Sequence, residues 1–251
     1  MAGSALAWAA EAAVRAASLN LCTDEMLLLL AEPRQIVSVS HLSADPLESR
    51  LAASARRYPI NRGTLESVAR HRPTLLLTMG SSGGDRLRIA GRLGVRVLDL
   101  PYPSSPREVV GQARMVARAL GRPRAAEPFA AALNRLEASA GPSQEGVFLS
   151  HGGSSIAPGG LSAEWLRLAG FRQPALPGNR LTLERLATAP PKWLILSDYR
   201  ASQQSRGQAF LAHPLVRRLA SRALRTDGRA WTCGGLPMLA EVARLRAARP
   251  R

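Results

Sequence analysis

Two segments match without gaps: Thr64-Leu-Glu-Ser-Val-Ala-Arg-His-Arg-Pro-Thr-Leu-Leu-Leu77 and Thr182-Leu-Glu-Arg-Leu-Ala-Thr-Ala-Pro-Pro-Lys-Trp-Leu-Ile195, with six identities in fourteen positions. Each predicts a short helix capped by threonine, with a glutamate near its N-terminus, where the helix dipole favours a carboxylate. A proline then stops the helix, and a continuous apolar run predicts a fully buried strand. Two unrelated helix–strand units could share this composition, but their equivalent placement in each half favours an internal duplication.

The sequence around these segments alternates apolar runs with helical periodicity. In the first half we expect strands at 14–19, 36–40, 75–79 and 95–100, and helices at 24–31 and 85–93. The second half repeats the pattern, with strands at 147–150, 193–197 and around 224–226, and helices beginning at Ala163, Thr182, Gln208 and Leu236. This alternation predicts an α/β fold of two Rossmann-like lobes, each with a parallel sheet.

The segment 106–140 between the halves has helical spacing and no strand signal. We therefore expect an N-terminal lobe at 13–105, a connecting helical segment at 106–140 and a C-terminal lobe at 141–251. Lobes joined by helix rather than by loops have limited hinge motion, and their strand ends would face one common cleft.

The overall charge is strongly basic, with 34 Lys and Arg against 18 Asp and Glu and a formal net charge of +16. Such a charge can indicate nucleic-acid binding. Lys192 is the single lysine, however, and the arginines are scattered without interleaved aromatic residues, so we do not expect a nucleic-acid partner. No apolar run approaches the roughly 18 residues that would span a bilayer.

The first twelve residues are small and apolar, with small-x-small triplets of the kind that signal peptidase accepts. We interpret residues 1–12 as the remnant of a secretory signal, the alternative being an ordinary N-terminal helical turn. Cys22 and Cys233 are the only two cysteines. An exported chain would often pair them, but a disulfide, free thiols and metal ligation by thiolate all remain open, with a disulfide or a reduced pair favoured over metal.

Ligands of open parallel sheets bind beyond the carboxyl ends of the strands. The residues just past the expected strands combine glycines, polar donors and aromatic side chains, a mixture that suits a large and partly apolar ligand better than acid–base catalysis. We therefore predict a ligand-binding cleft whose wall includes His41, Tyr58, Met79, Ser81, His151, Tyr199, Arg200 and Trp231.

Catalytic signatures are weak. The sequence has no G-x-S-x-G nucleophile elbow, no G-x-x-x-x-G-K-[ST] phosphate loop and no G-x-G-x-x-G after the first strand. We predict no enzyme activity, no catalytic residue, no cofactor and no resident metal. One alternative is a metal-binding or chelatase-like two-lobe enzyme, in which His41 and His151 share a metal across the cleft.

Five stretches, in this order and spacing, carry a resemblance to a known family: Ser18-Leu-Asn-Leu-Cys-Thr-Asp-Glu-Met26, Gln35-Ile-Val-Ser-Val-Ser40, the 64–77 unit, Leu93-Gly-Val-Arg-Val-Leu-Asp-Leu100 and Trp231-Thr-Cys-Gly-Gly-Leu-Pro237. On these stretches the chain resembles the helical-backbone periplasmic binding proteins of ABC importers, which carry vitamin B12, ferric siderophores and haem. The resemblance extends from about Val14 to Arg249.

This resemblance implies two lobes bridged by a long helix, expected at 124–140, and a periplasmic monomer that delivers an iron complex or a corrinoid to a permease and its ATPase. It also implies one carboxylate on each lobe that docks onto arginines of the permease. Glu66 and Glu184 match those positions, although both could serve only as helix caps. The B12-binding members carry a tryptophan shortly before the first of these glutamates, where this chain has Tyr58-Pro-Ile-Asn61, so the ligand within this class stays open.

Overall fold

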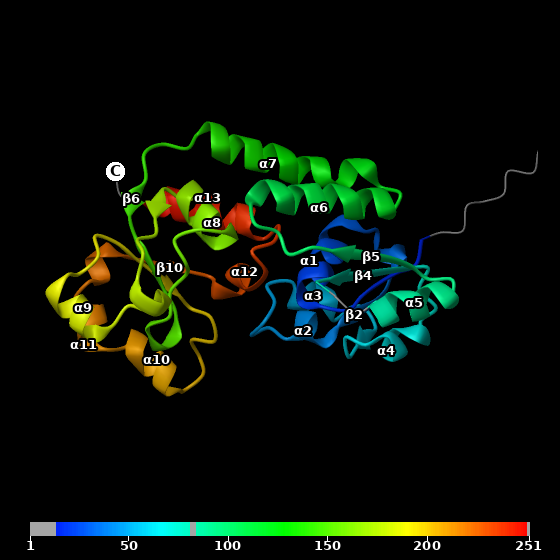
Figure 1. Ribbon diagram of the computed structural model, residues 1–251, viewed down its shortest axis with the longest axis horizontal. Helices are drawn as coiled ribbons and strands as arrows, with labels where there is room; N and C mark the ends of the chain where they lie inside the picture. The colour runs from blue at the N-terminus through cyan, green and yellow to red at the C-terminus, as the bar shows by residue number, and fades with distance from the viewer. Residues whose placement is uncertain (1–13, 81–83, 250–251) are drawn as a thin grey trace, which may run out of the picture.

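The computed structural model describes residues 14–80 and 84–249. The segment 1–12, interpreted as a signal remnant, lies outside the described residues, as does Ser81. Figure 1 shows two lobes, each with its own sheet and helices, and a pair of helices along one side of both. The α/β fold with parallel sheets in two lobes is confirmed.

The N-terminal lobe holds a five-stranded parallel sheet in the order β3-β2-β1-β4-β5. Its strands are β1 (Ala16–Ser18), β2 (Ile36–Ser40), β3 (Ile60–Asn61), β4 (Leu75–Met79) and β5 (Arg96–Leu100). The helices of this lobe are α1 (Leu21–Leu30), α2 (His41–Ala44), α3 (Ala52–Ala55), α4 (Leu65–Ala69) and α5 (Gly84–Arg92).

Alternate residues of β4 pack on opposite faces of this sheet, as the pleat requires. Leu75 and Leu77 belong to the main hydrophobic core with residues of α1, whereas Leu76 packs with Leu65 and Val68 of α4 in a separate cluster. The sheet is therefore buried on both faces, which explains why its central strand is a continuous apolar run.

The C-terminal lobe has a three-stranded parallel sheet in the order β10-β9-β7 and a separate parallel pair, β6 with β8. The strands are β6 (Gln144–Glu145), β7 (Val147–Leu149), β8 (Phe171–Arg172), β9 (Leu194–Ser197) and β10 (Ala223–Thr226). The helices are α8 (Leu161–Leu168), α9 (Leu183–Thr188), α10 (Arg206–Leu211), α11 (Pro214–Arg217), α12 (Gly228–Cys233) and α13 (Met238–Ala248).

The two copies of the duplicated segment occupy equivalent places. Thr64 and Thr182 cap α4 and α9, accepting hydrogen bonds from the backbone N–H of Ser67 at 3.3 Å and of Arg185 at 3.2 Å. The strands that follow, β4 and β9, each lie between two neighbours in their sheets. The pattern of capped helix followed by buried strand is thus present in both lobes.

The long helix expected at 124–140 is present but shorter, and a second long helix precedes it in the connecting segment. The segment consists of α6 (Pro106–Ala119) and α7 (Glu127–Ala138), which run side by side in opposite directions and are joined by a 3-10 turn (Pro123–Ala126). Pro123 lies at the start of that turn, and the second helix therefore begins only at Glu127. The twelve residues of α7 lead from α6 back to the C-terminal lobe, where α7 packs against α13.

One hydrophobic core runs through both lobes. It joins Leu27 and Leu30 of α1 to Val116 of α6, and continues through Leu133 of α7 to Trp165 of α8. Because the lobes share this core, a change in the angle between them would require repacking of buried side chains, whose contacts are dense.

Candidate functional site

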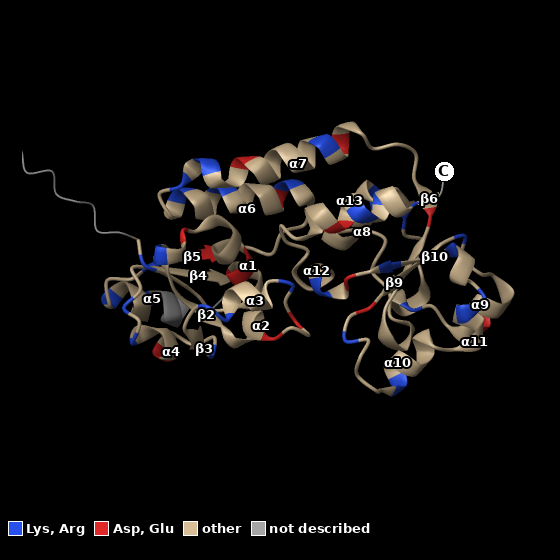
Figure 2. Cartoon of the chain, turned by 180° about the vertical axis from the view of Figure 1, so that it is seen from behind, with Lys and Arg blue, Asp and Glu red and all other residues tan. Residues whose placement is uncertain are grey.

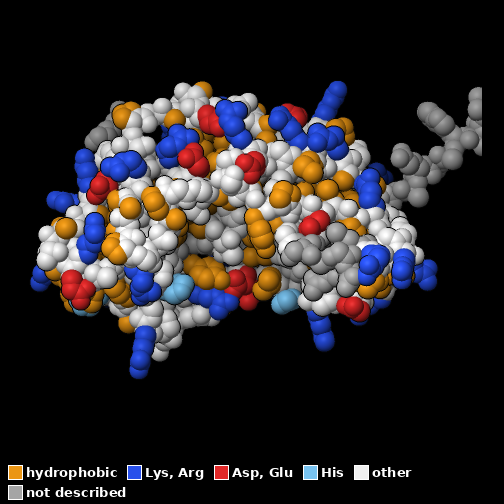
Figure 3. Space-filling view, viewed as in Figure 1, with side chains coloured by type: hydrophobic (Ala, Val, Ile, Leu, Met, Phe, Trp, Pro, Cys, Tyr) orange, Lys and Arg blue, Asp and Glu red, His pale blue; other side chains and the backbone are white. Residues whose placement is uncertain are grey.

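The carboxyl ends of the two sheets meet between the lobes. The loop 45–50, which follows α2, reaches from the N-terminal lobe to the turns after β9 and β10 in the C-terminal lobe. We call the space between them the interlobe groove; its cavity is about 200 Å³ and is lined by Pro46, Leu47, Asp198, Arg200, Ala201, Ser202, Asp227 and Arg229. Figure 3 shows a hollow between the lobes, with apolar, basic and acidic side chains together where the lobes meet.

Glu48 ties the loop to the C-terminal lobe. Its side chain is buried, and its Oε2 accepts a hydrogen bond of 2.6 Å from the hydroxyl of Tyr199. Its other oxygen pairs with the guanidinium of Arg200, which lies 5.6 Å from the centre of the Tyr199 ring. Burial and the charge of Asp45 raise the pKa of Tyr199, so the phenol remains a hydrogen-bond donor at neutral pH.

Arg50 forms a second set of ion pairs across the groove. Its guanidinium lies 3.2 Å from Asp227 and 3.4 Å from the buried Glu241. Burial disfavours the charge on Glu241, but hydrogen bonds from Arg244, from the hydroxyl of Thr226 and from the backbone N–H of Asp227 outweigh it and lower the pKa of Glu241. Both acids are therefore charged at neutral pH and hold Arg50 in place.

A disulfide between Cys22 of α1 and Cys233 at the end of α12 is the third connection, with the two Cα atoms 5.3 Å apart. Glu25 lies beside it, and its buried Oε2 has no hydrogen-bond partner. A Cβ added to Gly235 would lie 2.8 Å from that oxygen, so a side chain at position 235 would collide with the carboxyl. Burial raises the pKa of Glu25 to about 8, with the charge of Asp24 adding to the shift and that of Arg50 opposing it.

Asp24 fixes the start of α2. One carboxylate oxygen accepts a hydrogen bond of 3.0 Å from the backbone N–H of Ser40, and the other accepts from the hydroxyl of the same residue. Burial still raises the pKa of Asp24. The contact holds the turn that places His41 at the carboxyl end of β2.

The residues predicted to form the ligand wall fall into three groups. His41 and His151 are exposed in different lobes; His41 directly follows β2, and His151 follows the end of β7 by two residues. Tyr199 and Arg200 both contact Glu48, and Arg200 also lines the interlobe groove. Tyr58, Met79 and Trp231 are half-buried against the main core.

Trp231 has specific partners within the C-terminal lobe. Its ring centre lies 4.7 Å from that of Phe148, and its indole N–H donates a hydrogen bond of 2.7 Å to the hydroxyl of Thr226. These contacts fix the position of the ring against the core.

Glu66 and Glu184 are exposed in the first turns of α4 and α9. These two helices lie far apart in Figure 1, on different lobes and on the side away from α6 and α7. Hydrogen bonds from the backbone N–H of Glu184 and from the hydroxyl of Thr182 lower the pKa of the Glu184 carboxyl. Glu184 therefore contributes to helix capping while its carboxylate stays accessible.

Sequence reasoning missed several residues of this region. Glu48 and Arg50 lie in a loop with no periodic signal, and their partners are more than 150 residues away in sequence. Tyr102 could have been found by the strand-end argument, because it follows β5 by two residues and is 75% exposed. Its ring lies against Gly80, where an added Cβ would be 2.3 Å from a ring carbon.

Two further observations concern chemistry and location. Within residues 14–80 and 84–249, no three or more His, Cys, Asp and Glu side chains are grouped so that they could hold a metal ion. The helices described by the structure include none with the length and apolar composition needed to cross a membrane.

Two lobes of parallel sheet, facing strand ends and a helical connection define a two-lobe binding protein of the type that encloses a ligand between its halves. Residues 17–227 match the family model of the periplasmic binding proteins, and the chain belongs to this family. Among curated protein sequences, none matches the chain significantly.

Solved structures of similar fold cover nearly the whole chain. The periplasmic haem-binding protein RhuT from Roseiflexus sp. RS-1 is 20% identical, with a TM-score of 0.69 over 94% of this chain and 97% of that one. The periplasmic haem-binding protein HutB of Vibrio cholerae is 20% identical, with a TM-score of 0.68 over 94% and 98%. The periplasmic vitamin B12-binding protein BtuF of Vibrio cholerae is 17% identical, with a TM-score of 0.64 over 93% and 95%.

Proposed function

We propose that this protein is the periplasmic binding component of an ABC importer and carries a metal chelate, either an iron complex (siderophore or haem) or a corrinoid, between its lobes. The observation that carries the proposal is the family membership together with a fold shared, over more than nine-tenths of the chain, with proteins that bind haem or vitamin B12. The protein would bind and release the chelate without covalent chemistry.

The residues around the interlobe groove support a chelate ligand. His41 and His151 are exposed at the strand ends of the two lobes, and histidine is a common axial ligand of haem iron. Tyr102 offers an exposed aromatic ring at the same edge of the N-terminal sheet. These side chains would flank a flat ligand, whereas Pro46 and Leu47 would provide apolar contact at the floor.

The contacts between the lobes indicate how the ligand would be taken up. Separation of the lobes is opposed by the shared core, by the Cys22–Cys233 disulfide and by the ion pairs of Glu48 and Arg50. A largely preformed groove fits this arrangement, because the protein would lose little conformational freedom on binding. A disulfide between lobes also suits an oxidising compartment such as the periplasm.

Delivery would use the exposed glutamates. Glu66 and Glu184 present one carboxylate on each lobe, and we propose that they dock onto arginines of the permease, through which the protein acts on the ATPase. Exposed ion pairs of this kind set orientation and encounter rate more than affinity.

The test is a titration of the purified protein with haemin, cyanocobalamin and a ferric siderophore, followed by quenching of tryptophan fluorescence. We expect one of the three to bind with a dissociation constant well below about 100 μM. If all three bind more weakly than this, the assignment to metal-chelate uptake is wrong.

A further inference from the structure

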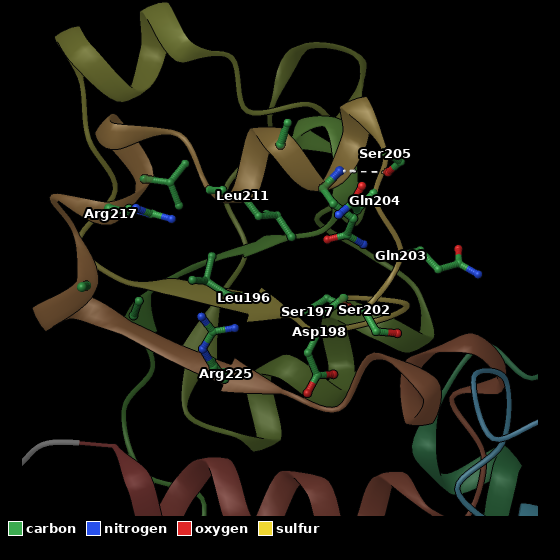
Figure 4. Close-up of a pocket in the computed structure, with 17 residues that line it drawn as sticks. Leu196, Ser197, Asp198, Ser202, Gln203, Gln204, Ser205, Leu211, Arg217 and Arg225 are labelled. Carbon is green, nitrogen blue, oxygen red and sulfur yellow. Dashed lines mark hydrogen bonds between the residues drawn. The ribbon is translucent and has the colours of Figure 1, made fainter.

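The C-terminal lobe contains a cavity that the proposed transport function does not use. This cavity, which we call the C-lobe pocket, has a volume of about 600 Å³, against about 200 Å³ for the interlobe groove. It lies between β9 and β10 on one side and α10 and α11 on the other, and Figure 4 shows its lining. Its size is within the range of pockets that bind small molecules.

Helix α10 packs against the 3-10 turn (His151–Gly153) that follows β7. A Cβ added to Gly207 of α10 would lie 3.2 Å from the Cβ of His151, and one added to Gly153 would lie 3.0 Å from the ring of Phe210. The side chain of Gln208 donates a hydrogen bond of 3.0 Å to the backbone oxygen of Tyr199. These contacts fix α10 beyond the carboxyl ends of β7 and β9, and the cavity lies between this helix and the residues of β9 and β10 that line it.

The floor of the pocket is apolar. Leu196 of β9, Leu211 of α10 and Val216 of α11 all line it and belong to the hydrophobic cluster on this face of the sheet. Leu196 and Leu211 are only partly buried, so a ligand with an apolar part would remove their exposed surface from water.

Two arginines supply the charge. Figure 4 shows Arg225 rising from β10 toward Leu196 and Arg217 reaching from α11 toward Leu211. Neither guanidinium has a hydrogen-bond or ion-pair partner in the part of the chain that the structure describes. Asp198, an acid in the same lining, already accepts a hydrogen bond of 2.9 Å from the backbone N–H of Gly228. The pocket therefore has unpaired positive charge beside its apolar floor.

We propose that the C-lobe pocket binds a small amphipathic anion, with a carboxylate or phosphate held by Arg217 and Arg225 and an apolar body over Leu196, Leu211 and Val216. Guanidinium groups bind both head groups through paired hydrogen bonds. Gln204 and Ser205 line the other side of the pocket and can bind polar substituents. The pocket adjoins the interlobe groove, since Asp198, Ala201 and Ser202 line both, but the two arginines and the apolar floor that would hold the anion line the C-lobe pocket alone.

The experiment is isothermal titration of the full chain with three probes of the same chain length: octanoate, octyl phosphate and 1-octanol. We expect binding of octanoate, octyl phosphate or both, which distinguishes a carboxylate from a phosphate ligand, and much weaker binding of the uncharged alcohol. Binding of 1-octanol as tight as that of the anions would mean that the pocket is merely apolar and would overturn the proposal.

Variants locate the binding. Replacing Arg217 and Arg225 together by alanine (R217A/R225A) should weaken the anion by about tenfold or more, since each loses a charge-assisted hydrogen bond. The control variant R218A/R222A removes the same charge from exposed arginines that do not line the pocket, and should leave the affinity unchanged. Equal losses in the two variants, or no binding of either anion to the wild type at about 5 mM, would refute the site.

Discussion

Removal of the Cys22–Cys233 disulfide should destabilise the protein strongly. The bond closes a loop of 211 residues and connects the two lobes. In the chain-entropy relation, closing a loop of this length in the unfolded state corresponds to about 5 kcal/mol at 25 °C. Because one hydrophobic core runs through both lobes, we expect the native fold to persist without the bond and the loss to appear as reduced stability.

The assay is equilibrium unfolding in guanidinium chloride, comparing the wild type with the C22A/C233A variant and with the wild type kept reduced. We expect the free energy of unfolding to fall by about 3–5 kcal/mol in both, with a single cooperative transition. A loss below about 1 kcal/mol would contradict the assignment of the bond as a constraint on the whole chain. Two separate transitions would contradict the shared core.

The remaining predictions concern carboxylates. Glu48→Gln should lower the free energy of unfolding by about 1–3 kcal/mol, because a buried charge pair between the lobes is lost. As a control in the same unfolding assay, Glu145→Gln at an exposed position should change the free energy of unfolding by less than about 0.5 kcal/mol. Burial raises the pKa of Glu25 in the folded state to about 8, from an ordinary value of 4.5. Between these two pH values the folded state retains a proton that the unfolded state loses, so this group lowers stability as the pH rises from about 4.5 through about 8. Glu25→Gln should therefore make thermal stability fall less between pH 5 and pH 8.5 than it does in the wild type; parallel pH profiles would show that the carboxyl is not buried. Replacing Glu66 and Glu184 by alanine should leave the dissociation constant of the chelate unchanged and reduce uptake through the permease in reconstituted vesicles, and normal uptake would exclude docking through these residues.

Much of the architecture could be predicted because it depends on local patterns. The strands at 36–40 and 75–79 have the predicted bounds, since each is an apolar run ended by turn residues. The strands β3, β6 and β8 were missed because two residues are too few for any periodicity. The helical spacing of 106–140 predicts the helical connection, but the 3-10 turn at Pro123–Ala126 places the start of the helix expected at 124–140 at Glu127.

The candidate site was less predictable, because it depends on contacts between distant parts of the chain. The strand-end argument identified Tyr199 and Arg200, but not that Glu48 would hold both of them. The sequence leaves the pairing of Cys22 and Cys233 open, and only the folded chain brings their Cα atoms to 5.3 Å from each other. Irregular loops such as 45–50 carry no pattern that indicates where they pack.

The most direct test of the central claim is hydrogen–deuterium exchange with and without the chelate that binds in the fluorescence titration. If the ligand lies between the lobes, peptides covering residues 45–50, 198–202 and 227–229 should exchange more slowly in the complex, since these segments line the interlobe groove. Unchanged exchange in all three segments, with protection confined to another surface, would contradict the claim that this family member holds its ligand in the groove.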